Sequence, residues 1–188
     1  MISETAHHRE CANGCGARKD EAAHAYGGGT VCTVCGYETY TKGLTFAEVF
    51  AENGETAIGY EVTGCAEALG EIVVPARHEG LPVTAIASRA FYGESGITAL
   101  RLPNTVSEIG ANAFNKCTEL EEVVFSEGLK TIGASAFAKC GFKRIELPSG
   151  LQTVGAKAFS NCAALESVSV GRGIETFEAG AFYLSRNV

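Results

Sequence analysis

The amino-acid sequence predicts a β-rich solenoid, a right-handed coil of short strands and turns, from three observations. First, five segments end in the same Ala-Phe pair. They end at Phe91, Phe114, Phe137, Phe159 and Phe182. Second, these phenylalanines follow one another after 23, 23, 22 and 23 residues, and a fixed period of this size is typical of solenoids. Third, a short run of β-forming residues, followed by a turn, lies between each pair of neighbouring phenylalanines.

Each unit follows the pattern L-x-x-I-x-L-P-x-x-V-x-x-I-G-x-x-A-F-x-x-C-x-x. The β-forming runs are ITALRL (97–102), LEEVVF (120–125), FKRIEL (142–147) and LESVSV (165–170). We expect the first, fourth and sixth residues of each run to point inward, as Leu120, Val123 and Phe125 would in the second run. One unit cannot bury this apolar face alone, so the units should stack at about the 4.8 Å strand spacing. The period of 22 to 23 residues falls within the range of leucine-rich repeats.

The motif LPxxVxxIGxxAFxxC resembles the BspA-like leucine-rich repeats, also called the Treponema pallidum type, from about residue 81 to residue 188. The first and last units depart from it, because Glu94 and Ser185 stand where the other units have cysteine. The resemblance implies a leucine-rich-repeat solenoid in a bacterial cell-surface or secreted protein. It also implies a non-catalytic function, adhesion or protein binding, with a protein or a glycan as ligand.

A strand pair is expected before the repeats, within a leucine-rich-repeat domain that covers residues 44–188. GLTFAEVF and TAIGYEVTG flank Asn53-Gly54, a strong signal for a hairpin turn. Residues 44–80 should therefore form a β-hairpin cap and lead into the first coil. His78 is expected to lie in a solvated turn beside Glu79 and Gly80.

Four cysteines precede this domain and indicate a separate cysteine-rich, zinc-ribbon-like module over residues 1–43. They are Cys11, Cys15, Cys32 and Cys35. Their spacing, C-x3-C, sixteen residues and then C-x2-C, is close to that of structural zinc sites. A segment with so few large apolar residues needs such a staple to fold. Structural Zn²⁺ competes here with disulfides formed in an oxidising compartment and with a reduced, partly disordered arm.

Three other cysteines are set by the repeat and predict a structural role. Cys117, Cys140 and Cys162 each follow the repeated phenylalanine by three residues. An inward-facing cysteine behaves as a small apolar side chain and a weak hydrogen-bond donor. We therefore expect these thiols to be buried, and expect no bridge or metal ladder among them.

Composition and motifs argue against several classes of function. With 22 acidic and 15 basic residues the net charge is −7, which disfavours nucleic acid as a partner. No apolar stretch reaches the length of a membrane-spanning helix, and no leader is recognised at the start of the sequence. No nucleophile, base or contrasting carboxylate pair predicts an enzyme. The alternative to a surface protein is a cytosolic zinc-ribbon protein that recruits a protein or nucleic-acid partner, with the repeats as a scaffold.

A binding surface is predicted from the strand residues that point away from the core. These are the third and fifth residues of each β-forming run. The candidates are Arg101, Glu122, Val124, Arg144, Glu146, Ser167 and Ser169. They form a mixed, mildly charged face rather than an apolar groove, and the family resemblance implies a protein or a glycan as its ligand.

Overall fold

The computed structural model describes residues 40–185 and contains thirteen strands in that range. The strands are β1 (Leu44–Phe50), β2 (Ala57–Cys65), β3 (Gly70–Val73), β4 (Arg77–His78), β5 (Leu81–Ile86), β6 (Ile97–Arg101), β7 (Glu108–Ile109), β8 (Glu122–Val124), β9 (Thr131–Ile132), β10 (Arg144–Leu147), β11 (Thr153–Val154), β12 (Ser167–Val170) and β13 (Thr176–Phe177). No helix in this part of the chain is long and apolar enough to cross a membrane.

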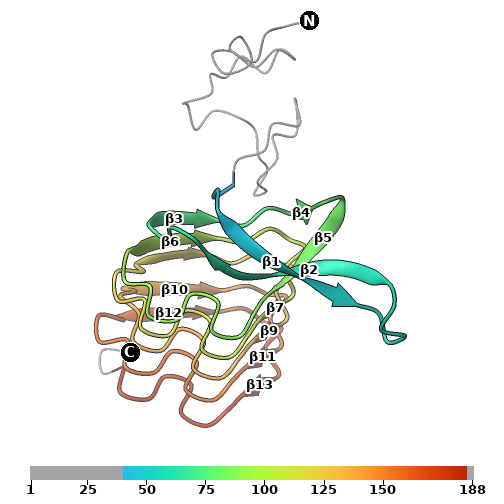
Figure 1. Ribbon diagram of the computed structural model, residues 1–188. Coiled ribbons are helices and arrows are strands. Elements are labelled where there is room, and N and C mark those ends of the chain that lie inside the picture. Colours follow the sequence, from blue (N-terminus) through green and yellow to red (C-terminus); the bar gives the residue numbers. More distant parts are fainter. Residues whose placement is uncertain (1–39, 186–188) are drawn as a thin grey trace, which may run out of the picture.

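The strands form a solenoid of about five turns, as the repeat predicts. One side is a sheet in the order β1-β2-β5-β7-β9-β11-β13, with β4 paired to β5. The opposite side carries β3, β6 and β8 in one sheet and β10 and β12 in another. Figure 1 shows the two sides, with turns running between them from coil to coil. Each coil therefore packs only on its neighbours along the axis.

A column of phenylalanine rings fills the interior. The rings of Phe91, Phe114, Phe137 and Phe159 are fully buried, and Phe182 is partly buried in the last coil. Neighbouring rings stack nearly parallel, with centroids 5.0, 5.2, 5.5 and 5.4 Å apart along the column. These separations are close to the strand spacing, so the Ala-Phe pair of each unit falls in register with the next.

The repeated cysteines confirm the structural role expected of them. The thiols of Cys117, Cys140 and Cys162 donate to carbonyl oxygens of the preceding coil, with sulfur to oxygen distances of 3.1, 3.2 and 3.2 Å. Ser185 occupies the same position in the last unit, and its hydroxyl donates to the Phe159 carbonyl at 2.7 Å. Each donor is therefore hydrogen-bonded inside the fold and links its coil to the backbone of the coil before it.

The glycine of the Ile-Gly pair is required by the close approach of successive coils. A Cβ on Gly133 would lie 2.7 Å from the backbone nitrogen of Ala111, and one on Gly155 would lie 2.6 Å from that of Ala134. Real Cβ atoms do not approach backbone this closely. The two glycines therefore set how tightly the coils can stack.

The first strands join the solenoid directly. β1 and β2 pair antiparallel around the predicted turn, in which Gly54 has a φ of 70°. β2 also pairs in parallel with β5, so it forms part of the first coil.

The expectation for His78 is wrong. Its ring is half-buried and stacks on Phe46, with centroids 3.9 Å apart, while the ring of Tyr60 meets it edge-on. His78 and the preceding residue, Arg77, form β4, which pairs with β5. This contact joins residues 32 positions apart in the chain, so the local Glu79-Gly80 turn signal could not reveal it.

Candidate functional site

A single missing residue distinguishes the third repeat from its neighbours. Two residues separate Cys117 from Leu120, and two separate Cys162 from Leu165, but only Gly141 separates Cys140 from the next strand segment. This shorter connection accounts for the one step of 22 residues among steps of 23. It lies immediately before β10.

The strand ladder is interrupted at this point. β6 pairs with β8 through three residue pairs, and β10 pairs with β12 through four. Among the described residues, no backbone hydrogen bond joins 121–125 to 143–147, although the Gly141 N–H donates to the Leu120 carbonyl at 3.1 Å. Since the alternation keeps Ile145 and Leu147 inward, we infer that the missing residue is absorbed by displacement of the strand, which opens the ladder.

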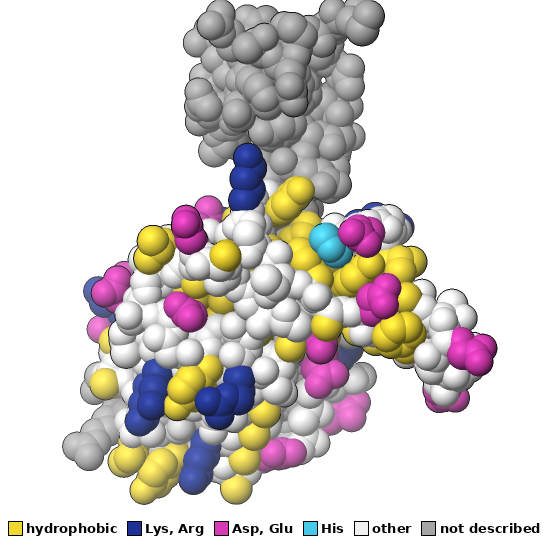
Figure 2. All heavy atoms as spheres, viewed as in Figure 1, with side chains coloured by type: hydrophobic (Ala, Val, Ile, Leu, Met, Phe, Trp, Pro, Cys, Tyr) yellow, Lys and Arg dark blue, Asp and Glu magenta, His cyan; other side chains and the backbone are white. Residues whose placement is uncertain are grey.

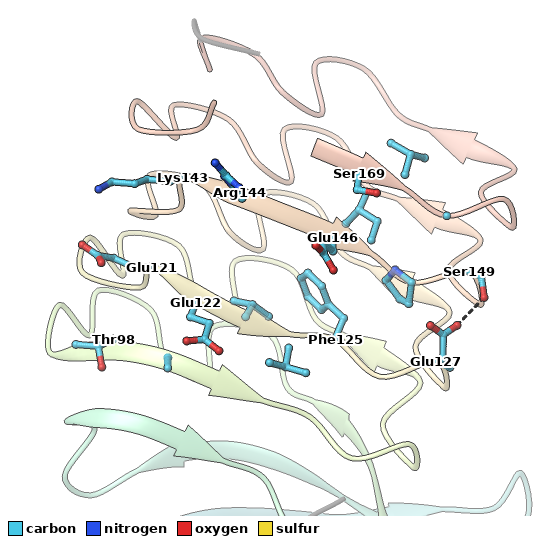
Figure 3. A pocket seen from close by; sticks show the side chains of 17 residues that line it. Thr98, Glu121, Glu122, Phe125, Glu127, Lys143, Arg144, Glu146, Ser149 and Ser169 are labelled. Carbon is cyan, nitrogen blue, oxygen red and sulfur yellow. Dashed lines mark hydrogen bonds between the residues drawn. The ribbon is translucent and has the colours of Figure 1, made fainter. Parts of the chain in front are cut away.

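A groove with a volume of about 990 Å³ lies over the interruption. Its lining comes mainly from β8, β10 and the turns that follow them, with a few residues of β6 and β12, and Figure 3 shows these side chains on the strand face. Val124 is 41% exposed and Val170 is 51% exposed on this surface. Val123 and Phe125 are only partly buried, although the pattern predicts both as inward-facing, because the following coil does not pair with their strand.

Charged side chains surround the apolar part of the groove. Lys143 and Arg144 lie toward one end, Glu127 lies at the other, and Glu146 lies between them (Figure 3). The Ser149 hydroxyl donates to the Glu127 carboxylate at 2.6 Å. These side chains offer both signs of charge over a short distance.

The charges in the groove are largely left free to meet a ligand. Within residues 40–185 the ion pairs join Arg101 to Glu71 and, at 3.5 Å, to Glu122. Arg144 and Glu146 therefore have no ion-pair partner in the part of the chain that is described. Exposed charges of this kind can hydrogen-bond a ligand without first breaking an internal pair.

The predicted surface residues are all exposed on the strand face, and five of the seven line the groove. These five are Glu122, Val124, Arg144, Glu146 and Ser169. Arg101 and Ser167 lie outside it. The pattern did not find Lys143, Glu127 or Ser149, which lie at the ends of strands or in turns. The step of 22 residues is the signal that could have located the groove.

The buried thiols offer no reactive site. Burial raises the pKa of Cys117 to about 12 and that of Cys162 to about 11, and it raises the pKa of Cys140 further. A thiol is a nucleophile or a metal ligand only as the thiolate. All three are free cysteines, as is Cys65.

Residues 40–185 contain no group of three or more histidine, cysteine or acidic residues that could hold a metal ion. The four cysteines predicted to bind zinc, Cys11, Cys15, Cys32 and Cys35, lie outside the described residues.

The family of BspA type leucine rich repeat regions matches residues 84–188 in six copies. The chain belongs to this family. The match covers more than half of the sequence and coincides with the coils that carry the phenylalanine column. It indicates no family of enzymes, and members of leucine-rich-repeat families typically bind other molecules without catalysis.

Solved structures of bacterial leucine-rich-repeat proteins share the fold. The Treponema pallidum leucine rich repeat protein is 30% identical, with a TM-score of 0.73 over 81% of this chain and 69% of that chain. A protein from Bacteroides ovatus is 26% identical, with a TM-score of 0.53 over 81% of this chain and 46% of that one. A leucine rich cell surface protein from Faecalibacterium prausnitzii is 24% identical, with a TM-score of 0.51 over 77% and 45%. No curated protein matches the chain.

Proposed function

We propose that this protein is a non-catalytic binding protein whose ligand, a protein or a glycan, occupies the groove between β8 and β10. The observation that carries the proposal is the coincidence of the shortened repeat, the interrupted ladder and the groove of about 990 Å³. A solenoid with uniform repeats would present an even sheet at this place. The groove instead gives the strand face one distinct position.

The composition of the groove suits recognition of a polar ligand. Val124, Phe125 and Val170 provide apolar area, and Arg144 and Glu146 provide opposite charges at its border. Binding sites commonly combine an apolar centre with a few polar groups that orient the ligand. The remaining predicted residues, Arg101 and Ser167, would extend this surface along the strand face.

The setting we propose is the bacterial cell surface or the secreted fraction, with adhesion as the role. Family membership supports this setting, because it agrees with what the repeat motif implies. The acidic surplus of the chain supports a protein or glycan ligand over nucleic acid.

Quantitative binding to panels of purified extracellular-matrix proteins and of immobilised glycans tests this proposal. Any ligand of the wild type should bind at least tenfold more weakly to Val124→Glu, which places a charge in the apolar part of the groove. Thr176→Glu adds the same charge at an exposed position of β13, in the opposite sheet and outside the groove, and should bind normally. A ligand that both variants bind as the wild type does would refute the groove as its site.

We also propose that residues 1–43 form a module in which Cys11, Cys15, Cys32 and Cys35 hold one structural Zn²⁺, and that the β1–β2 hairpin covers the first coil of the domain at 44–188. The cysteine spacing supports the first part, and the pairing of β2 with β5 supports the second. Native mass spectrometry of the full chain should show one zinc per molecule. A mass lower by four protons without metal would instead indicate two disulfides.

A further inference from the structure

A second surface lies on the turns that carry the chain from the first sheet back to the strand face. Two positions in each of these turns have a positive φ, and eight of them are occupied by residues other than glycine. The eight residues are Arg89, Asn112, Lys116, Ser135, Lys139, Lys157, Asn161 and Leu184. The equivalent positions stack along the solenoid axis because the coils are in register.

Four of these eight positions carry a basic residue, one in each of four consecutive coils: Arg89 and Lys157 at the first position of their turns, and Lys116 and Lys139 at the second. Arg89, Lys116, Lys139 and Lys157 have φ values of 63°, 70°, 63° and 57°. Glycine and asparagine adopt this conformation readily, whereas long side chains are strained in it. Basic residues at half of these non-glycine positions therefore place four long cationic side chains on one series of turns.

Two of these cations lie over the ring of Tyr92. The Arg89 guanidinium carbon lies 4.4 Å from the ring centroid, and the Lys116 ammonium lies 5.1 Å from it. The pKa of Tyr92 lies below its ordinary value because Lys116 donates a hydrogen bond to the phenolic oxygen. Partial burial opposes this lowering, and the charges of Lys116, Arg89 and Lys139 add to it. Cations held over a ring are already oriented when a ligand arrives.

These cations have no carboxylate partner within residues 40–185, where the ion pairs all involve Arg101. All four are exposed. Figure 2 shows basic side chains gathered on the face formed by the turns, while acidic side chains lie mainly toward the sides and the upper part of this view. In a chain with a net charge of −7, this is a local reversal of sign.

We propose that the basic column of Arg89, Lys116, Lys139 and Lys157 binds a linear glycan through tetrahedral oxyanions, as sulfate or phosphate esters. A chain that lies along the solenoid axis meets one cation per coil. Adjacent coils repeat at about the 5.2 Å that separates the rings of Phe114 and Phe137. The column is independent of the strand groove and does not require it.

The width of the column favours a single thin chain over a broad anionic surface. Glu94 and Glu178 are exposed in the same turns, beside the basic column, and Glu178 accepts a hydrogen bond from the Ala156 N–H at 2.9 Å. A nucleic-acid duplex or an anionic membrane would be brought against these carboxylates and against the acidic remainder of the protein. A glycan chain can follow the column and avoid them.

Binding of the full chain to dextran sulfate and to phosphorylated dextran, with neutral dextran as the blank, tests the proposal. We expect salt-sensitive binding to at least one charged dextran and none to neutral dextran. Lys116→Gln/Lys139→Gln should weaken binding about fivefold to tenfold at low salt, because each exposed contact contributes modestly. Tyr92→Leu keeps every charge but removes the ring that orients Arg89 and Lys116, and it should weaken binding about threefold.

The matched control is Lys130→Gln/Arg172→Gln, which removes the same charge at exposed positions outside both the basic column and the strand groove, and should leave binding unchanged. Equal losses in the two double variants would show that overall charge, not the column, attracts the polymer, and would overturn the proposal. Binding to single-stranded DNA or to anionic phospholipid vesicles that is as tight as binding to the dextrans would also overturn it, as would no binding to either charged dextran. Thermal unfolding of each variant verifies that it is folded.

Discussion

Inserting one residue between Gly141 and Phe142 should repair the strand ladder. A serine there gives the third repeat the same two-residue connection as its neighbours, and restores the period of 23. β8 should then pair with β10, as it now pairs with β6 through three residue pairs. About three added backbone hydrogen bonds contribute roughly 1 kcal/mol each. Ordering one more residue offsets about 1–2 kcal/mol of this gain.

The expected net result is a gain of about 1–2 kcal/mol in the free energy of unfolding, measured by urea denaturation. Amide hydrogen exchange should slow at Val123 and Val124, and the groove ligand should be lost. The same insertion after Gly54, in the hairpin turn, lengthens the chain without touching the ladder and should change neither exchange rate. If exchange at Val123 and Val124 stays fast in a folded insertion variant, the shortened connection is not what opens the ladder.

Three further predictions concern the core. Phe114→Ala should lower the free energy of unfolding by about 3–5 kcal/mol, whereas Phe177→Ala, at an exposed position, should lower it by less than about 1 kcal/mol. Gly133→Ala should cost about 1–3 kcal/mol, because its Cβ would meet the preceding coil, and calorimetry would show a lower melting temperature. Burial raises the pKa values of Cys117 and Cys162, so the free energy of unfolding has its full value below about pH 8.5, the pKa of a thiol in the unfolded chain. It falls as pH rises from there toward 11 to 12, because the thiols then ionise in the unfolded state and stay protonated in the folded state. The free energy of unfolding should therefore decrease between pH 7 and pH 9.5 by about 2–3 kcal/mol less in Cys117→Ser/Cys162→Ser than in the wild type, as measured by urea denaturation. Equal decreases in the two proteins would contradict the raised pKa values of these thiols.

The repeat made much of the fold predictable. The phenylalanine column and the cysteine hydrogen bonds follow from positions that recur in every unit, so one alignment of the chain with itself places them all. The alternation within each run also predicts which strand residues face out, and it places all seven candidate surface residues on the exposed side. These features are local or periodic, and sequence patterns report such features well.

Other features depend on contacts that no local pattern encodes. The stacking of His78 on Phe46 joins two strands through the fold of the first coil. The partial exposure of Phe125 results from a residue missing sixteen positions later, before Phe142. The shortened step is visible in the sequence, but its effect on hydrogen bonding between coils appears only when the strands are placed side by side.

The departures from the repeat mark both proposed surfaces. Because the stability of a solenoid is approximately a sum over units and their interfaces, a fault at one interface costs only the contacts of that interface. The chain can therefore keep a broken ladder between β8 and β10, and strained cations such as Lys116 and Lys139, without losing the core beneath them. The insertion site after Gly141 lies in the connection that leads into β10, beyond the turns that carry both lysines. An insertion there should therefore change the strand groove and leave the basic column in place. The insertion that closes the groove should leave binding of a charged dextran at the basic column intact.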